Sequence, residues 1–416
     1  RFAMRGTIIM KHEQRVVYGG VDTHQDVHVA AVIDELGVLL GTRSFPTSLL
    51  GLKSLHRWLT GHGPVVKVGV EGTGTYGLGL QRVLQDAGVE VVEVNRPNRQ
   101  LRRAKGKSDT VDAESAARAV LAGQATATPK RHDGIVEAIR MLLVAHTSTK
   151  QALQKIDGRI RGLTITAPEA LRVDFAGLSA PARAERAVRL RPGSDHREVT
   201  SATKLSLRTL GRQRQMLAAD LKSLEVELEQ LTTEANPGLR QVPGVGPIVA
   251  ATLLVTVGDN PERMTSEATF AALCGVSPVP ASSGKTVAMR LNRGGNRQAN
   301  SALFRIALVR MSQQDKATID YVQRRTAQGL SKKAILRCLK RFIARQIYRH
   351  LVDPRPAIRT DDLRARRQAI KRPLREVADA LNTQIMAISC LERGTNHNAD
   401  LATRYRNWLQ QQETAA

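Results

Sequence analysis

The chain has 416 residues, with 63 Lys and Arg against 38 Asp and Glu and a formal net charge of +25. A chain of this length exceeds one ordinary hydrophobic core, and charge of this sign favours a polyanionic partner, with nucleic acid ahead of a membrane surface. Neither a membrane-spanning apolar run nor a signal peptide is recognisable, so we expect several domains in a cytoplasmic protein that makes no membrane contact.

The cysteine and aromatic contents narrow the class further. Cys274, Cys338 and Cys390 are widely spaced, which excludes a zinc finger of the usual spacing and gives no disulfide framework. Aromatic residues make up 3% of the chain, so stacking of bases on aromatic rings cannot dominate recognition. Contacts with phosphates and with the shape of the nucleic acid must therefore account for more of the recognition.

The first predicted element is a β-hairpin over residues 16–34. Two apolar β-branched runs flank the sequence Gly-Val-Asp, which places Asp22 near the middle of the first strand. A carboxylate in a strand is costly unless it binds something. Asp22 is therefore a candidate functional residue.

Three later acids extend this candidate site. Glu71 ends a predicted strand over residues 65–71, and Asp109 and Asp112 open an Ala-rich helix, three positions apart and so on one helical face. Mg²⁺ takes oxygen ligands, and two-metal sites act on phosphodiesters. Each acid alone is more often an ordinary surface residue. The set of Asp22, Glu71, Asp109 and Asp112 predicts a Mg²⁺ site.

The rest of the first domain alternates strands with helices, which predicts an α/β layer fold. Helices are expected over residues 49–59 and 76–87, and a further strand over 89–94. A basic loop follows and precedes Asp109, so we interpret it as a loop that holds phosphates rather than as a solvated face. Its cations are Arg96, Arg99, Arg102, Arg103, Lys105 and Lys107.

The four acids also resemble the D-E-D-D pattern of the RuvC-like domains in the insertion sequence one-ten family of transposases. That family is related to the Piv DNA invertases and is guided by a bridge RNA. The resemblance implies an RNase H-like fold for the N-terminal third and a Mg²⁺-dependent reaction on DNA. It has a second part near residue 280, described below.

Between residues 136 and 231 the pattern changes to long helices. Leucines occupy the a and d positions of one heptad frame over about four heptads, which predicts a coiled-coil seam, with a long buried bundle helix as the alternative. Arg214 is the polar exception at an a position. Prolines in residues 167–197 interrupt the helices, and the resulting arm suits dimer formation. The seam leucines are Leu207, Leu210, Leu217, Leu221, Leu224, Leu228 and Leu231.

Residues 239–251 carry a helix-hairpin-helix signature. Gly244 and Gly246 permit close backbone approach, and a helix beginning near Pro247 presents free N–H groups to a phosphate. A structural turn between helices is the alternative. In a chain this basic we favour phosphate contact without sequence reading.

The second part of the resemblance covers residues 270–285 and 290–300, which look like the transposase motif of the same family. A serine before glycine is the nucleophile there, which points to Ser283, with Ser282 as the rival. A Ser-Gly turn among cations can expose a hydroxyl where a phosphodiester is neutralised. The chain offers no Ser-His-Asp arrangement nearby, so we expect the Mg²⁺ to reach Ser283 from a separate domain. The neighbouring cations are Lys285, Arg290, Arg293 and Arg297.

The C-terminal region follows a linker rich in Pro and Arg. Residues 374–394 resemble the helix-turn-helix of phage-repressor-like regulators, with Asn382 where a left-handed turn residue is needed. The recognition helix would start near Thr383 and offer Thr383, Gln384 and Ala387 to the major groove. A small helical tail domain without this function is the alternative.

The expected organisation is therefore α/β followed by mostly helical domains. The expected domains are a RuvC-like domain at 14–130, a coiled-coil arm at 131–236, a transposase domain at 237–351, a linker at 352–367 and a helix-turn-helix at 368–416. We interpret the chain as a site-specific DNA recombinase in which a serine forms a covalent link to DNA. The alternatives are a RuvC-like nuclease without that link and a non-enzymatic DNA-binding regulator. Expected partners are donor and target DNA, a bridge RNA and further copies of the chain, as a dimer that assembles into a tetramer. In a bacterial cell it would associate with the nucleoid when bound to DNA.

Overall fold

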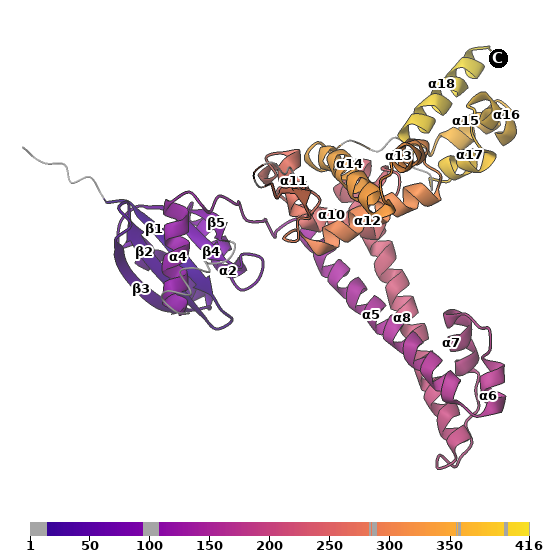
Figure 1. The fold of residues 1–416 in the computed structure, drawn as a ribbon, viewed down its shortest axis with the longest axis horizontal. Helices are drawn as coiled ribbons and strands as arrows, with labels where there is room; N and C mark the ends of the chain where they lie inside the picture. The colour runs from indigo at the N-terminus through magenta and orange to yellow at the C-terminus, as the bar shows by residue number, and fades with distance from the viewer. Residues whose placement is uncertain are drawn as a thin grey trace, which may run out of the picture. The chain divides into compact units, whose positions relative to one another are not determined.

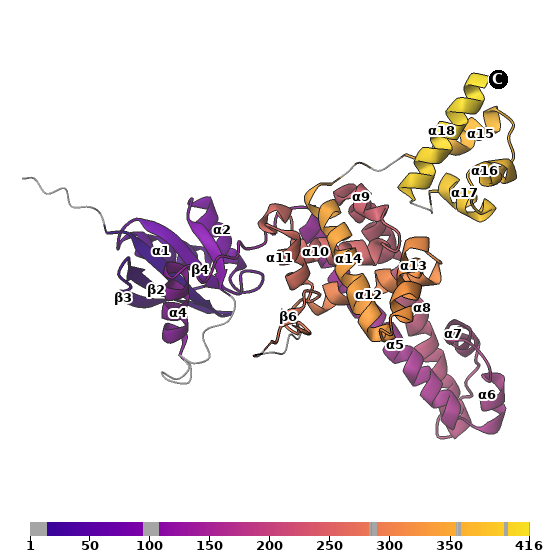
Figure 2. The same ribbon diagram turned by 45° about the horizontal axis from the view of Figure 1, so that its top comes forward.

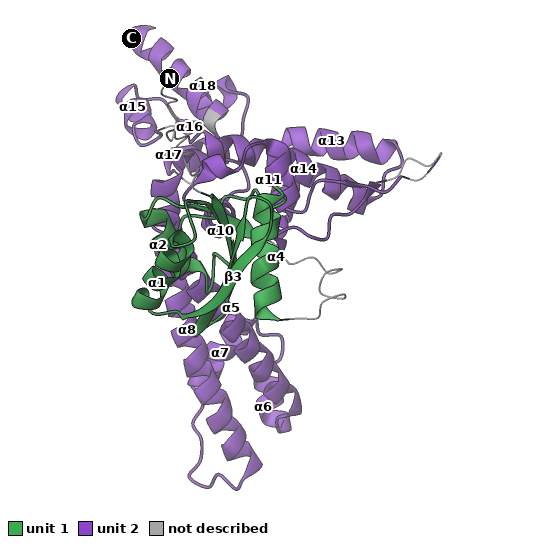
Figure 3. Ribbon diagram, turned by 90° about the vertical axis from the view of Figure 1, so that its left-hand side faces the viewer, with its two compact units in different colours: residues 1–132 green, residues 133–416 purple. Residues whose placement is uncertain are grey.

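The computed structural model describes residues 15–94, 108–282, 284, 289–354, 356, 359–394 and 398–415. The chain divides into two compact units, residues 1–132 and 133–416, coloured separately in Figure 3. In the described ranges, no helix has both the length and the apolar character needed to cross a membrane.

A five-stranded mixed sheet forms the centre of the first unit (Figure 1). Its order is β3-β2-β1-β4-β5, so the first strand lies in the middle. β1 pairs antiparallel with β2 and parallel with β4, and the predicted hairpin is present. The strands are β1 (Val17–Thr23), β2 (Val27–Asp34), β3 (Leu39–Pro46), β4 (Val65–Glu71) and β5 (Glu90–Val94).

Helices cover both faces of this sheet, as the alternating pattern predicts. α1 (Leu49–Thr60) and α2 (Leu78–Asp86) contribute leucines to a core with residues such as Val21 and Val68. α4 (Asp109–Leu121) lies on the opposite face, where its alanines and Val120 pack on the sheet (Figures 1 and 2).

Gly20 sets how closely α4 approaches β1. A Cβ added at Gly20 would lie 2.2 Å from the Ala113 carbonyl oxygen and 2.2 Å from the Ala117 amide nitrogen. Gly69 on β4 is similarly covered, since its Cβ would lie 2.6 Å from a Val120 methyl. The helix backbone therefore rests directly on the two central strands.

The arm of the second unit is a pair of long helices, α5 (Ile135–Thr166) and α8 (Val199–Ala235) (Figure 1). His146 contacts Glu225 at 3.3 Å and Asp157 accepts from Arg214 at 2.6 Å. Residue numbers thus rise along α5 as their partners' numbers fall along α8, so the helices are antiparallel. The short helices α6 (Glu169–Asp174) and α7 (Ala180–Val188) lie between them in sequence.

Within one chain, the heptad seam of α8 packs against α5, and pairing of two copies through this arm stays a prediction. Leu207 and Leu228 are fully buried, in clusters that also hold Ile156 and Leu143 of α5 respectively. Arg214, the polar a-position residue, donates to Asp157 of α5 with 13% of its side chain exposed. Heptad spacing predicts that a seam exists, and it does not distinguish a partner helix in the same chain from one in another copy.

Short helices and one long helix form the main core of the second unit. Leu239, Leu254, Phe270, Leu303 and Ile343 are among its buried side chains. A two-stranded hairpin projects from this group. The elements are α9 (Pro237–Arg240), α10 (Pro247–Val257), η1 (Pro261–Arg263), α11 (Glu267–Leu273), β6 (Val279–Pro280), β7 (Met289–Arg290), α12 (Arg297–Ser312), α13 (Lys316–Ala327) and α14 (Lys332–Val352).

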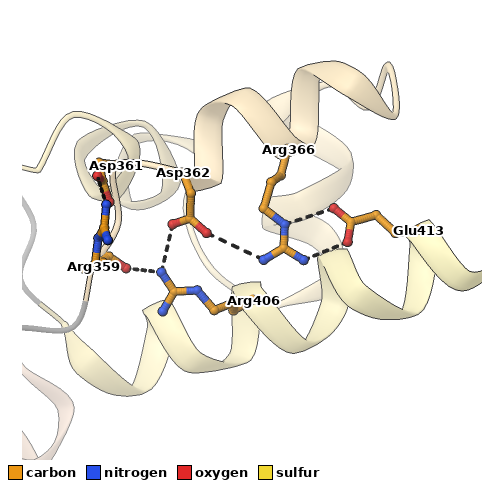
Figure 4. Close-up of polar contacts among 6 residues, drawn as sticks. All are labelled: Arg359, Asp361, Asp362, Arg366, Arg406 and Glu413. Atoms are coloured by element: carbon orange, nitrogen blue, oxygen red, sulfur yellow. Dashed lines mark hydrogen bonds and ion pairs between the residues drawn. The ribbon is translucent and has the colours of Figure 1, made fainter.

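A four-helix tail ends the chain. Its core holds Leu363, Ile388 and Tyr405. Ion pairs fasten its first helix to its last: Arg366 donates two hydrogen bonds to Glu413, and Arg406 donates to Asp362 at 2.8 Å (Figure 4). The helices are α15 (Leu363–Ala369), α16 (Leu374–Ala380), α17 (Ile385–Glu392) and α18 (Ala399–Ala415).

The predicted linker, residues 352–367, is too long, because α15 begins at Leu363 and belongs to this tail. Leu363 is fully buried in the tail core, and the largely buried Arg367 donates to Glu392 at 2.7 Å. The run of arginines is typical of a solvated linker, but two of them are tied to acids far along the chain. Because Arg406 of α18 also donates to the Arg359 carbonyl oxygen, a deletion that removes the whole tail starts at or before Arg359 rather than at residue 368.

Gly20→Ala tests the close approach of α4. The added methyl meets backbone atoms that cannot rotate away, so we expect the free energy of unfolding of the first unit to fall by roughly 1–3 kcal/mol or more. Gly74→Ala is the matched control, since Gly74 is exposed and its added Cβ would have only an ordinary contact, 3.8 Å from His132 Nε2. Thermal or urea denaturation measures both. Equal stability of the two variants would contradict the predicted packing.

Leu217→Asp combined with Leu224→Asp tests the arm. Both leucines are half-buried in the seam, so the charges should lower its stability by about 1 kcal/mol or more for each leucine. Ser223→Asp with Gln230→Asp adds the same charge at exposed positions of α8 and should have little effect. Helix melting is followed by circular dichroism and mass by light scattering. An unchanged melting curve with a halved mass would mean that the seam joins copies instead.

Candidate functional site

Successive side chains of β1 point to opposite faces of the sheet, and this alternation directs Asp22 toward α4. Val17 and Val21 face the core under α1 and α2, whereas Gly20 faces α4, and Asp22 is two positions beyond Gly20. Asp22 is only 8% exposed. A largely buried carboxylate at the end of a central strand is thus directed at the helix that crosses that strand.

The first turn of α4 supplies two more acids. Ser108 caps the helix, since its hydroxyl accepts a hydrogen bond from the Val111 amide at 3.3 Å. Asp109 and Asp112 both lie in the first turn, where the positive end of the helix dipole favours anions. Asp112 is buried, whereas the side chain of Asp109 is about half exposed.

His24 lies between the acids of the two elements. Its Nε2 is 3.2 Å from Asp22 Oδ2 and 3.5 Å from Asp109 Oδ1. Among the described residues, Asp22, His24 and Asp109 each offer a ligand atom within 4.8 Å of the others. His24 is not among the site residues predicted from the sequence. Its position two residues after Asp22 was the available signal.

Glu71 lies beside this group on the neighbouring strand. β1 and β4 pair in parallel with Val21 opposite Val70, so Asp22 and Glu71 are one step further along. Thr23 Oγ1 donates to the Glu71 carbonyl oxygen at 2.8 Å, which holds the two strand ends together. Glu71 is half-buried, and its carboxylate is not in the set of mutually close ligand atoms.

The electrostatics suit a bound cation. Burial raises the pKa of Asp22 above its usual value, His24 opposes this, and the negative charges of Asp109 and Asp112 raise the pKa further. A divalent cation would reverse this balance, because it replaces repulsion among the carboxylates with attraction. The donor set, carboxylate oxygens with one imidazole nitrogen, fits a divalent metal. No metal is identified here.

The predicted nucleophile and much of the predicted phosphate-binding set lie outside the described residues. These are Ser283, Lys285, and the loop cations Arg96, Arg99, Arg102, Arg103, Lys105 and Lys107. Three predicted cations are described, and all are exposed: Arg290 on β7, Arg293 in the turn that follows, and Arg297 at the start of α12. Asn296 caps α12 by accepting from the amides of Gln298 and Ala299.

The helix-hairpin-helix turn has a structural part and an open part. Gly244 has φ +85°, and a Cβ there would lie 3.1 Å from the Ile306 carbonyl oxygen, so this glycine makes room for α12. Gly246 precedes α10 and has open space around it. Arg310 donates to the Pro243 carbonyl oxygen at 2.8 Å and braces the turn. Packing explains why residue 244 is a glycine, and phosphate contact by Gly244 and Gly246 stays a prediction.

The tail contains two helices joined by a tight turn. Asn382 has φ +47°, the left-handed conformation expected of it, and the Thr383 amide donates to the Ala378 carbonyl oxygen at 2.9 Å. α17 begins at Ile385 with Gln384 as its N-cap, so the predicted start near Thr383 is two residues early. Gln384 is exposed and Thr383 is half-exposed.

Comparisons with known proteins match both parts of the chain. Residues 19–164 match a family model described as a transposase of the DEDD, IS110 type, and residues 237–323 match the model described as "Transposase IS116/IS110/IS902 family". A protein of Streptomyces coelicolor, printed as "Insertion element IS110 uncharacterized 43.6 kDa protein", is 37% identical over 141 residues. That match covers 33% of this chain and 33% of the relative, so it spans about a third of each.

The mixed sheet, with acids from β1 and α4 inside the first matched region, defines a DEDD-type transposase domain. The second matched region contains the segment in which a serine nucleophile was predicted. With both regions present in one chain, the protein belongs to the IS110 family of transposases.

Asp22→Asn tests the metal site through stability. In the wild type, saturating Mg²⁺ should raise the melting temperature, since ligand at about 100 times its Kd adds about 2.7 kcal/mol. In Asp22→Asn this increment should be largely lost. Asp26→Asn, which changes an exposed acid of the β1–β2 turn, should behave as the wild type. Differential scanning fluorimetry at matched ionic strength measures all three.

The metal-free proteins supply the second half of this test. A raised pKa means that ionised Asp22 destabilises the fold, so the cost is present at neutral pH and disappears as pH falls toward the ordinary value of 3.8. Without metal, Asp22→Asn should therefore be at least as stable as the wild type at pH 7. A variant that is less stable in both conditions would contradict the assignment.

Proposed function

We propose that the protein is a transposase that acts as a site-specific DNA recombinase. The observation that carries this proposal is the meeting of Asp22, Asp109 and His24 at the β1–α4 contact, within the region that matches the DEDD model. The net charge of +25 supports a nucleic-acid substrate.

Asp22, Glu71, Asp109 and Asp112 are the residues that would hold divalent metal, typically Mg²⁺ for this class of domain. Bound there, the metal would supply Lewis-acid stabilisation of charge on a phosphodiester. The chain's own contribution is to fix the carboxylates. β1 and β4 position Asp22 and Glu71 through strand pairing, and the capped first turn of α4 positions the other two.

Ser283 is the proposed nucleophile. Its Oγ would form a bond to phosphorus while the bond from phosphorus to a deoxyribose oxygen breaks, giving a phosphoserine link and a free DNA hydroxyl. The serine's proton is lost as the new bond forms, and the released oxygen takes up a proton. Arg290, Arg293 and Arg297 are exposed cations in the same segment of chain, which supports neutralisation of the phosphate.

The partners are proposed from charge and from the family resemblance. Donor and target DNA would be bound together with a structured bridge RNA, by a dimer that assembles into a tetramer. In the tail, the exposed Gln384 and the half-exposed Thr383 would contact DNA in a major groove. Phosphate contact by Gly246 at the start of α10 would add affinity without sequence reading.

A metal-dependent nuclease is the second candidate. The acids would hold a metal that supplies activation of a water molecule, with no covalent link to protein, and the acid cluster is the observation that favours this. A regulator without enzymatic activity leaves that cluster without a role. The two enzymatic candidates differ in whether protein becomes attached to DNA.

Trapping this covalent link tests the proposal. Wild type incubated with labelled target DNA, co-purified RNA and Mg²⁺ should give a band that resists denaturation. Ser283→Ala should lose the adduct while its affinity for DNA stays near wild type, because one hydroxyl contributes little to a large ionic interface. Asp109→Ala should lose cleavage and adduct by several hundred-fold or more, through loss of the metal.

Ser282→Ala is the matched control and should keep the adduct. An adduct that survives in Ser283→Ala but not in Ser282→Ala would move the nucleophile by one residue. Hydrolytic nicks without any adduct in the wild type would favour the nuclease.

A further inference from the structure

A slot in the second unit has a lining that neither the acids nor the serine explains. It is a cavity of about 670 Å³, in the size range of small-ligand sites, between the β6–β7 hairpin and the helices α13 and α14. α13 and α14 lie side by side (Figure 3). We call it the α13–α14 slot.

The slot has an aromatic wall. Tyr321 of α13 and Phe342 of α14 meet edge to face with ring centroids 5.4 Å apart. Half of the Phe342 side chain is exposed to water, which is unfavourable for an apolar ring unless a ligand covers it. Aromatic residues are only 3% of the chain, so two rings in one accessible slot are a local concentration.

The opposite wall is also apolar. Met289 is 62% exposed and Leu291 is 54% exposed, and both come from the hairpin strand β7 or the residue after it. Apolar side chains left exposed on both the hairpin and the helices that line one cavity indicate a binding site.

Cations surround this apolar interior. Six Lys and Arg residues are in the lining, and none of the described lining residues is acidic. Arg324 lies over the Tyr321 ring at 5.5 Å. Glu267 pairs with Arg341, which leaves the others in excess.

The cations are crowded as well as numerous. Burial lowers the pKa of Lys340, and the nearby charge of Arg337 lowers it further. Lys340 Nζ donates to Asn300 Oδ1 at 2.7 Å, which fixes its direction. The Arg325 Nε is buried with no hydrogen-bond partner in the described part of the chain. An anion in the slot would relieve this repulsion.

A planar apolar group that carries negative charge on one side is the ligand that these features select. Duplex bases are stacked on one another and cannot enter between the walls, whereas an unpaired base can. We propose that the α13–α14 slot holds one unpaired nucleotide of a DNA or RNA strand, its base against Phe342 and Tyr321 and its phosphate among the arginines. This rests on the proposed function only in that a nucleic acid is bound.

Photocrosslinking tests the proposal at residue level. Full-length protein is irradiated with a short single-stranded oligothymidylate carrying one 5-iodouracil, in the absence of divalent metal, and the attached peptides are mapped by mass spectrometry. We expect attachment at Tyr321 or Phe342. The same base in a fully paired duplex should attach there at least tenfold less. An oligouridylate with 5-iodouridine is the RNA arm, and the stronger arm identifies the source of the nucleotide.

Affinity variants supply the second measurement. Phe342→Leu keeps an apolar side chain but removes the ring, so single-strand affinity should fall about fivefold or more, with duplex affinity unchanged. Phe304→Leu is the control, since Phe304 is a 37% exposed aromatic on α12 outside the slot. Fluorescence anisotropy measures both, and circular dichroism checks the folding.

Attachment elsewhere, equal attachment by duplex, or equal affinities of the two leucine variants would each overturn the proposal. These outcomes are separate from those of the recombinase test, since neither measurement needs metal or Ser283. Crosslinking at the slot without a covalent DNA adduct would support this inference and contradict the covalent mechanism. An adduct in the wild type without crosslinking at the slot would support the covalent mechanism and contradict this inference.

Discussion

The candidate site depends on how closely α4 can lie on the central strands. At Gly20 and Gly69 the strands have no side chain toward the helix, and even one methyl at Gly20 would overlap backbone atoms of α4. Because the helix lies this low, its first turn reaches the level of Asp22 at the end of β1. A larger residue in either strand would lift the helix and separate acids that come from distant parts of the sequence. Packing thus determines the chemistry available here.

This packing creates an electrostatic cost that the fold must tolerate. Asp22 is buried near two further carboxylates, and its pKa is raised for that reason. Two features limit the cost. The first turn of α4 places Asp109 and Asp112 at the positive end of a helix dipole, and His24 offers a nitrogen to both Asp22 and Asp109. His24 is also a possible metal donor, so the same side chain that lowers the cost could bind an entering metal together with the carboxylates.

Sequence reasoning found what local pattern encodes. The hairpin of β1 and β2, the strand that ends at Glu71 and the helix that opens with Asp109 all follow from alternation, capping and small-residue turns. His24 was missed because its role depends on the distance between two elements. The heptads of α8 predicted a seam, but only packing shows that Arg214 finds Asp157 within the same chain. Arg367 looked like part of a solvated linker, and its partner Glu392 is 25 residues away.

These ion pairs also bear on where nucleic acid is bound. Arg214, Arg240 and Arg367 are each tied to an acid and largely buried, so they serve the fold and leave no charge for a phosphate. An acid and a base that pair contribute nothing to the net charge, so the surplus of 25 belongs to cations without such partners.

In the second unit, Arg290, Arg293 and Arg297 are exposed, and the α13–α14 slot is lined by cations without acids. The exposed arginines and the cations that line the slot all follow the helix-hairpin-helix turn in the sequence. Binding of phosphates there would be ionic and sensitive to salt, whereas the metal site in the first unit depends on a few fixed carboxylates. The second unit thus offers exposed cations suited to phosphates, and the first unit offers a cluster of carboxylates suited to a divalent metal.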